Sequence, residues 1–227
     1  LQRRNQKLLE IAPCPNLSAS LRAKLVDASV KMAREAGYRS LGTFEYLMDP
    51  ADPGAFYFME VNPRLQVEHT VTEEWTGVDL VRTQLQIAAG KSLADLGLTE
   101  KKPFPGGYAL QVRINMEKMD ADGNTTPQSG TLSVYEVPSG KDIRVDGYGY
   151  GGYTVNPAFD SLLAKLTVTS DSDSFKEVVK KAARALSEFR IQGIGTNIPL
   201  MRALLERAEI VENRYDTRFI EENAAQL

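Results

Sequence analysis

A run of alternating polar and apolar residues spans Glu60–Glu68 and reads EVNPRLQVE. Successive side chains of an extended chain point to opposite faces, so one face of this run carries two carboxylates, two amides and a guanidinium. Pro63 cannot donate a hydrogen bond to a neighbouring strand, which predicts that the strand ends there and the chain continues as an extended loop. An ordinary solvent-facing strand edge would alternate as well, although such edges more often carry Lys, Thr and Ser.

A further carboxylate, Glu45, lies in the strand-like run 42–48, and Asp, Pro and Gly residues between this run and 56–62 predict a hairpin. If the hairpin pairs Glu45 with Glu60 or Asn62, two carboxylates and an amide converge. Two carboxylates at such a short distance repel each other unless a cation binds between them. Hard oxygen ligands of this kind suit Mg²⁺ or Mn²⁺ bound together with nucleotide phosphates. The pattern therefore predicts a metal–phosphate site.

Five other polar residues could act on a small oxyanion. The planar fork of Arg64 suits carbonate-like or phosphate oxygens, Gln66 can donate and accept, and Glu68 can serve as a base. Lys7 lies in a basic N-terminal stretch, and Arg113 lies in an alternating run, QVRIN. Both cations could equally be solvated surface charges.

Composition sets wide bounds. The chain has 227 residues, 42% of them hydrophobic, and a net charge of −3, which is ordinary for a globular protein and lacks the basic balance of a nucleic-acid binder. No apolar run approaches the roughly 20 residues of a membrane span. A single cysteine, Cys14, between two prolines, predicts a loop residue and no internal disulfide. A zinc site built on histidines is implausible because His69 is the only histidine, so His69 is expected to cap a helix or contact backbone.

The periodicity predicts an α+β fold in two parts, residues 1–102 and 103–227, divided at a cluster of Pro103, Pro105, Gly106 and Gly107. Helical spacing predicts helices at about 21–36 (capped by Ser18 or Ser20 and closed by Gly37), 79–89 (with an apolar stripe of Val81, Leu85 and Ala88), 175–189 (with a Ser174–Glu177 capping box) and 199–207. Strand signals fall at 108–115, 131–137, 143–146 and 163–169. The Gly-rich stretch 146–153 predicts a loop.

At this point the residues resemble a known family. Glu60–Arg64, EVNPR, with Glu45 in GTFEYL, is similar to the metal-binding strands of ATP-grasp enzymes. The continuation LQVEH resembles biotin carboxylases, whereas carbamoyl-phosphate synthetases continue with a Ser-rich segment. Matching segments QRRNQK, IAPCP, RIN, GYTVNPAFDSLLAKL and GIGTNIPL follow in the family order, and the resemblance covers nearly the whole chain. It implies the C-terminal section of an ATP-grasp domain followed by the smaller C-terminal domain of a biotin carboxylase.

The resemblance also implies residue roles. Glu45, Glu60 and Asn62 would hold metal ions on the phosphates of ATP, with nucleotide contacts from Gln2 and Asn5. Bicarbonate would be bound by Lys7, Arg64, Gln66 and the backbone amide of Val67. Glu68 would deprotonate bicarbonate, which attacks ATP to give carboxyphosphate. Arg113 would stabilise the enolate-like biotin that accepts CO₂, and such charge stabilisation is the physical basis expected for this chemistry.

The implied cofactors are ATP with Mg²⁺ or Mn²⁺, and biotin carried by a separate domain or subunit. The implied partners are that biotin carboxyl carrier, a carboxyltransferase and a second copy of the chain, in the cytoplasm or the mitochondrial matrix. Asn5 replaces the usual His of the family. The N-terminal half of the family is missing, so we expect these residues alone to be nearly inactive. The segments NQK and VNPAFDSLLAKL resemble multidomain acyl-CoA carboxylases more than a free-standing biotin carboxylase subunit. The alternatives are another ATP-grasp ligase or a non-catalytic dimerisation scaffold.

Overall fold

A computed structural model describes residues 1–49, 51–99 and 106–227, without the side chain of Pro53. The chain forms two compact units. One joins Leu1–Pro13 to Pro105–Leu227 and is called the sheet unit, and the other, Cys14–Phe104, is called the hairpin unit. Each unit is described by itself. The predicted boundary residues Pro103 and Pro105 lie outside the described residues.

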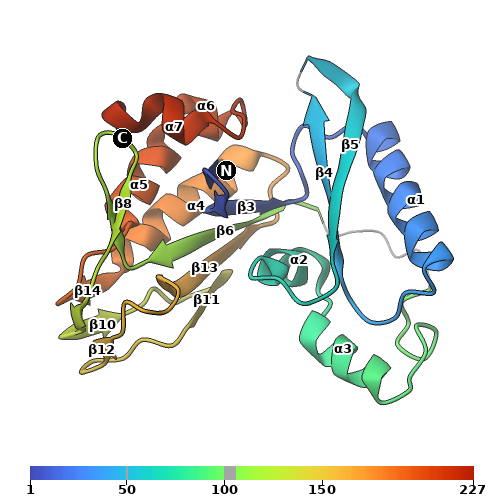
Figure 1. The fold of residues 1–227 in the computed structure, drawn as a ribbon, viewed down its shortest axis with the longest axis horizontal. Helices are drawn as coiled ribbons and strands as arrows, with labels where there is room; N and C mark the ends of the chain where they lie inside the picture. The colour runs from blue at the N-terminus through green and yellow to red at the C-terminus, as the bar shows by residue number, and fades with distance from the viewer. Residues whose placement is uncertain (50, 100–105) are drawn as a thin grey trace. The chain divides into compact units, whose positions relative to one another are not determined.

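The hairpin unit contains the antiparallel hairpin expected from the sequence, β4 (Thr43–Asp49) and β5 (Asp52–Asn62). Helix α1 (Ala19–Glu35) precedes it and lies beside it in Figure 1. The backbone N–H of Leu21 donates to Ser18 Oγ at 3.2 Å, which satisfies one of the unpaired donors of the first turn. Gly37 ends the helical stretch with φ of 57°, a conformation that glycine adopts without strain.

Two helices follow the hairpin, α2 (His69–Thr76), which the sequence did not reveal, and α3 (Leu80–Ala88). Asp79 caps α3, accepting from the Arg82 N–H at 2.7 Å. The apolar stripe of α3, however, is not buried, since Leu85 is 66% exposed. A stripe indicates an amphipathic helix, but its burial depends on a partner surface that local spacing does not specify.

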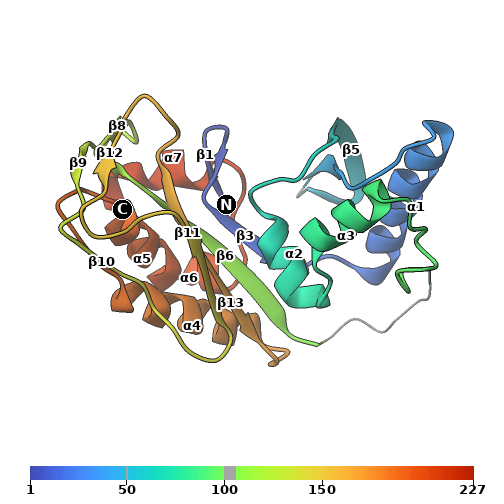
Figure 2. The ribbon, with the colours of Figure 1, turned by 90° about the horizontal axis from the view of Figure 1, so that it is seen from below.

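The sheet unit is built on a four-stranded antiparallel sheet in the order β11–β13–β6–β3. Its strands are β3 (Leu9–Ala12), β6 (Tyr108–Asn115), β11 (Ile143–Gly147) and β13 (Leu162–Ser170). Helices α4 (Phe175–Glu188) and α5 (Ile198–Glu206) cover one face, as Figures 1 and 2 show. Because β3 is the fourth strand, the first 13 residues pack with the C-terminal part of the chain. The domain boundary predicted between residues 102 and 103 stays a prediction.

The core of the sheet unit lies between the sheet and its helices. The apolar positions of α4 predicted to be buried are 0–8% exposed: Phe175, Val178, Ala182 and Leu186. They pack with alternate residues of β6, namely Leu110, Val112 and Ile114. The intervening residues of β6 therefore point to the opposite face of the sheet. This alternation directs Arg113 away from the helices.

Two local predictions for the sheet unit were wrong. The Ser174–Glu177 capping box does not form, because the Ser174 N–H donates to Ser172 Oγ at 3.1 Å and Glu177 accepts from Lys180 at 2.9 Å. The single strand expected at 131–137 is divided at the fully buried Leu132 into β9 (Gly130–Thr131) and β10 (Val134–Glu136). β9 pairs with β12 (Thr154–Val155), whereas β10 pairs with β14 (Arg190–Gln192).

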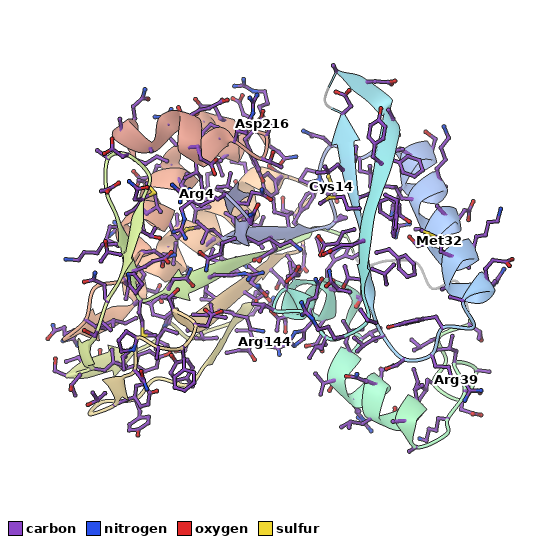
Figure 3. All side chains as sticks on the ribbon, viewed as in Figure 1. Arg4, Cys14, Met32, Arg39, Arg144 and Asp216 are labelled. Atoms are coloured by element: carbon purple, nitrogen blue, oxygen red, sulfur yellow. The ribbon has the colours of Figure 1, made fainter. Side chains whose placement is uncertain are left out.

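The remaining elements of the sheet unit are short. They are β1 (Gln2–Arg3), β2 (Gln6–Lys7), β7 (Glu117–Met119), β8 (Thr125–Pro127), α6 (Ala208–Val211), α7 (Phe219–Asn223) and a 3₁₀ helix (Ala224–Gln226). Cys14 is exposed in the loop after β3 (Figure 3). Across the three ranges that the structure describes, no helix is long and apolar enough to cross a membrane.

Candidate active site

Two carboxylates meet at one end of the β4–β5 hairpin. Glu45 lies directly opposite Glu60 in the antiparallel register, which confirms the predicted pairing. The side-chain amide of Asn62 donates to both acids, to Glu45 Oε1 at 3.0 Å and to Glu60 Oε1 at 2.8 Å. Side chains opposite each other on paired strands share a face, so the hairpin register alone brings this acid–amide cluster together.

Gln66 joins the same cluster from the loop beyond the strand. Its Nε2 donates to Glu45 Oε1 at 2.9 Å, so Glu45 accepts hydrogen bonds from two amides. The Oε1 of Gln66 is buried and has no hydrogen-bond partner within the described part of the chain. A buried acceptor without a donor costs about 1–3 kcal/mol, so a bound group with an O–H or N–H would be stabilised there.

The donor set of the acid–amide cluster fits Mg²⁺. Two carboxylates in contact with one amide place two negative charges close together, and a divalent ion would relieve their repulsion. In residues 1–49, 51–99 and 106–227 no group of three or more His, Cys, Asp and Glu side chains could hold a metal ion. A site with two acids leaves several positions of an octahedral ion to phosphate oxygens and water, as is usual for Mg²⁺.

The strand β5 ends at Asn62, as Pro63 predicted. The loop from Pro63 to Glu68 is not extended as expected, because it bends at Arg64, whose N–H donates to the Asn62 carbonyl at 2.9 Å, and turns again before α2. Arg64 is exposed, and its guanidinium donates to the backbone carbonyl of Leu65 at 3.3 Å. Glu68 occupies the N-cap position of α2 and is half-buried, with no capping hydrogen bond from its side chain. A carboxylate beside the first turn is favoured by the helix dipole. The only histidine, His69, contacts the backbone carbonyl of Gln66 at 2.7 Å, as expected.

In the sheet unit, Arg113 is held by an acid that the sequence argument missed. Glu10 on β3 accepts from Arg113 Nε at 2.6 Å, and Arg113 Nη2 lies 2.6 Å from the same oxygen. The two side chains are only 13% and 9% exposed, in the order Arg113 and Glu10. Gln111 adds a hydrogen bond to the second oxygen of Glu10 at 3.0 Å. The guanidinium is therefore fixed in direction by a charge-assisted pair on a rigid sheet.

Glu10 left one signal in the sequence, an acid between Leu9 and Ile11 in a short apolar strand. The face of the sheet opposite to α4 and α5 carries further charges at paired positions. Asp146 of β11 lies opposite Lys165 of β13, which in turn lies opposite Arg113 of β6. The two cations, Lys165 and Arg113, therefore lie opposite each other on one face, and each has an acid beside it, Asp146 opposite Lys165 and Glu10 in contact with Arg113.

Lys7 and Gln2 lie opposite each other on the β1–β2 hairpin, whose turn includes the exposed Asn5. The segment of Lys7 is joined directly to the strand of Arg113, because the Arg113 N–H donates to the backbone carbonyl of Leu8, the residue after Lys7, at 3.0 Å.

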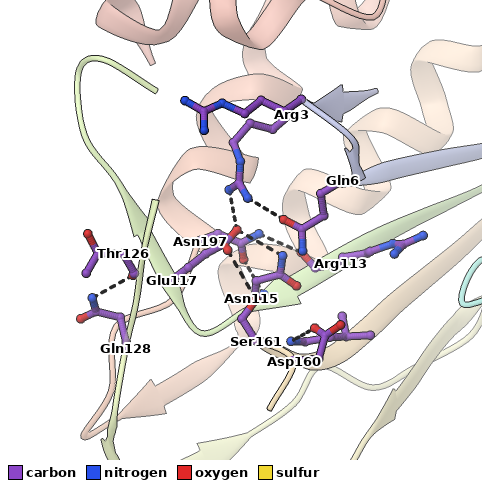
Figure 4. Close-up of polar contacts among 12 residues, drawn as sticks. Arg3, Gln6, Arg113, Asn115, Glu117, Thr126, Gln128, Asp160, Ser161 and Asn197 are labelled. Atoms are coloured by element: carbon purple, nitrogen blue, oxygen red, sulfur yellow. Dashed lines mark hydrogen bonds and ion pairs between the residues drawn. The ribbon is translucent and has the colours of Figure 1, made fainter. Parts of the chain in front are cut away.

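A buried polar network lies beneath this hairpin (Figure 4). Arg3 and Glu117 form an ion pair at 2.8 Å, and Asn115 donates to the same carboxylate oxygen at 3.2 Å. Asn197 brackets the end of β6, with its amide nitrogen 3.0 Å from the Arg113 carbonyl and its Oδ1 2.8 Å from the Asn115 backbone nitrogen. The network joins the segment that carries Lys7 to the strand that carries Arg113.

The predicted site residues thus form two sets, one within each unit. Comparison with known proteins relates the two parts of the sequence to two families. Residues 1–96 match the family of the carbamoyl-phosphate synthase L chain ATP-binding domain, and residues 111–222 match that of the biotin carboxylase C-terminal domain. Pyruvate carboxylase of Aspergillus niger is 42% identical over 223 residues, which are 98% of this chain and 18% of that protein.

Solved structures give the same result. A single-chain, multi-domain long-chain acyl-CoA carboxylase matches with a TM-score of 0.93 and 43% identity, over 100% of this chain and 24% of that one. The biotin carboxylase domain dimer of Hydrogenobacter thermophilus 2-oxoglutarate carboxylase, in complex with MgADP, ADP and bicarbonate, matches with a TM-score of 0.88 and 39% identity, over 98% and 47% of the two chains. The chain belongs to the biotin carboxylase family. It spans less than a fifth of the length of the pyruvate carboxylases that it matches.

Proposed function

We propose that this chain is part of a biotin carboxylase, an ATP-dependent ligase that uses bicarbonate to carboxylate biotin on a carrier domain. The observation that carries the proposal is the acid–amide cluster, in which Glu45 and Glu60 share the amide of Asn62. Phosphoryl transfer depends mostly on positioning and on charge neutralisation, so a strand-held pair of acids is the kind of site it needs. Other ATP-grasp ligases would use the same cluster, but they do not require the Glu68 and Arg113 chemistry described next.

In the hairpin unit, Glu45, Glu60 and Asn62 would hold Mg²⁺, which supplies positive charge to the phosphates of ATP. Support comes from the H. thermophilus relative, whose biotin carboxylase domain was solved with MgADP and bicarbonate. Gln66 would also line the bicarbonate site, where its buried Oε1 can accept a hydrogen bond from a bound group. Arg64, the Val67 N–H and Lys7 would bind the anionic oxygens. Gln2 and Asn5 would contact the nucleotide.

The chemical step would run as follows. Glu68 accepts the proton of bicarbonate, and a bicarbonate oxygen attacks the γ-phosphorus of ATP. The new P–O bond gives carboxyphosphate while the bond to ADP breaks. Carboxyphosphate then releases CO₂ and phosphate, the phosphate accepts the N1′ proton of biotin, and the N1′ lone pair attacks CO₂. The role of Arg113, oriented by Glu10, is to place a guanidinium at the biotin ureido oxygen, where negative charge develops.

The proposed partners are a biotin carboxyl carrier domain, a carboxyltransferase and a second copy of the chain, since the relatives include multi-domain carboxylases and a domain dimer. The carboxyltransferase would set the final acceptor, such as pyruvate, 2-oxoglutarate or an acyl-CoA. We place the enzyme in the cytoplasm or, in a eukaryote, the mitochondrial matrix. Residues 1–227 alone should show little ATP turnover, because the ATP-grasp lid of the family is not among them.

The test is bicarbonate-dependent, biotin-stimulated ATP cleavage by the complete product of the gene that encodes this chain. Glu68→Gln removes the proposed base and should lower the rate about 10²–10⁴-fold. The matched control is Glu35→Gln, at an exposed glutamate near the end of α1, which should leave the rate unchanged. An inactive wild-type protein, or a fully active Glu68→Gln variant, would refute the proposal and favour a scaffold or another ligase.

A further inference from the structure

A buried charge pair in the sheet unit has no role in the reaction proposed above. Arg3 is 8% exposed and Glu117 is 4% exposed, and they lie 2.8 Å apart. Burying two ions costs free energy that their attraction often fails to recover, and apolar residues of similar size can replace such a pair without loss of stability. The pair therefore calls for an explanation other than stability.

The alternation of the β1–β2 hairpin shows what the pair orients. Arg3 lies opposite Gln6, and Arg3 Nη2 donates to Gln6 Oε1 at 2.5 Å. Gln2 lies opposite Lys7. Neighbouring residues of a strand point to opposite faces, whereas residues opposite each other across the pair share a face. Arg3 and Gln6 thus form the anchored face of the hairpin, and Lys7 and Gln2 project from the other.

A hairpin of two residues per strand is too short to hold its own geometry in water. Arg4, in the turn of the hairpin, makes an exposed hydrogen bond to Asn124 at 3.0 Å. Arg3 makes a buried contact with Glu117, a residue that Ser161 also contacts at 3.4 Å. Glu117 begins β7, two residues after β6 ends, so its position is tied to the strand of Arg113. Figure 4 shows Arg3 reaching down to this group.

We propose that Arg3 and Glu117 are positioning residues for Lys7, which fix the face of the hairpin that presents its ammonium group to bicarbonate. This inference rests on the proposed function. A misplaced ammonium would weaken bicarbonate binding and leave the rest of the site in place. The expected signature is a higher KM for bicarbonate with kcat less affected.

The experiment compares variants of the complete gene product by bicarbonate-dependent ATP cleavage. The apolar pair Arg3→Met with Glu117→Leu should fold, as judged by hydrogen exchange in β6 that stays near that of the wild type, and should raise the bicarbonate KM at least tenfold. The control is the exposed ion pair of Glu136 and Arg190, 2.8 Å apart, replaced by Glu136→Leu with Arg190→Met, which should leave KM unchanged. If the buried pair variant does not fold, Glu117→Gln is measured in the same way.

A double-mutant cycle separates positioning from a general structural effect. If Glu117 acts through Lys7, Glu117→Gln should raise the bicarbonate KM in the wild-type background and have no further effect on it in a Lys7→Met background. A folded variant with the wild-type KM, or equal effects in both backgrounds, would overturn the inference while wild-type activity upheld the proposed function. A wild-type protein without bicarbonate-dependent ATP cleavage would overturn both.

Discussion

Removal of the Asn197 side chain should loosen the end of β6 that carries Arg113. Asn197 is 3% exposed, and its amide makes two hydrogen bonds to that strand, to the Arg113 carbonyl at 3.0 Å and from the Asn115 N–H at 2.8 Å. In Asn197→Ala both backbone groups lose their partners. An unsatisfied buried polar group costs about 1–3 kcal/mol, so the local opening of this strand end should become easier by about 2 kcal/mol or more.

The exchange rate of the Asn115 backbone amide, measured by mass spectrometry on the complete gene product, tests this prediction. A decrease of about 2 kcal/mol in the free energy of opening corresponds to about 30-fold faster exchange, since each 1.4 kcal/mol is a factor of ten. Asn156→Ala is the control, because Asn156 accepts the Ala158 N–H at 3.0 Å in an exposed turn of the same unit. Exchange at Asn115 within twofold of the wild type would show that Asn197 does not support the strand as described.

Two more variants test other parts of the structure. Glu10→Gln replaces the carboxylate that accepts from Arg113 Nε at 2.6 Å, so biotin-dependent ATP cleavage should fall about tenfold or more while cleavage without biotin persists. The same loss in an Arg113→Met background would contradict this coupling. Gly107→Ala would place a Cβ 1.8 Å from the Ser170 carbonyl oxygen at φ of 76°, and should destabilise the protein by more than about 4 kcal/mol in thermal unfolding. Gly152→Ala, with φ of 91° and no atom within 4 Å of the new Cβ, should cost only about 1–2 kcal/mol, and equal losses would be inconsistent with the clash.

The acid–amide cluster could be predicted from the sequence because its geometry is local. A turn rich in Asp, Pro and Gly indicated a hairpin, which places the two strands side by side. The two register shifts between the turn and Glu45 left no signal in the sequence. Glu10 could not be predicted in the same way, since its partner Arg113 lies 103 residues further along the chain. The addition of β3 to the sheet has the same cause, because pairing over about 100 residues leaves no periodic signal in either strand.

Local rules also failed where a competing neighbour was closer. The capping box of α4 had the correct spacing, but the Ser174 N–H donates to Ser172 instead, and Glu177 accepts from Lys180. The apolar stripe of α3 predicted an amphipathic helix, yet Leu85 is 66% exposed. Periodicity shows which face of a helix is apolar, but it does not show which other element packs on that face. Helix α2 was missed since its eight residues carry too short an apolar period to distinguish it from a loop.

The polar interior of the sheet unit favours orientation over stability. Glu10, Arg3 and Glu117 place three charges in sites at most 10% exposed in their side chains, where apolar residues would be at least as stable. Apolar packing is non-directional, whereas a hydrogen-bonded guanidinium–carboxylate pair restricts the position and the orientation of the guanidinium. A reaction that develops charge at a defined oxygen needs its cation fixed beforehand, because reorganisation during the step would cost rate. The buried acids are therefore best explained as the means by which this unit orients Arg113 directly and Lys7 through Arg3.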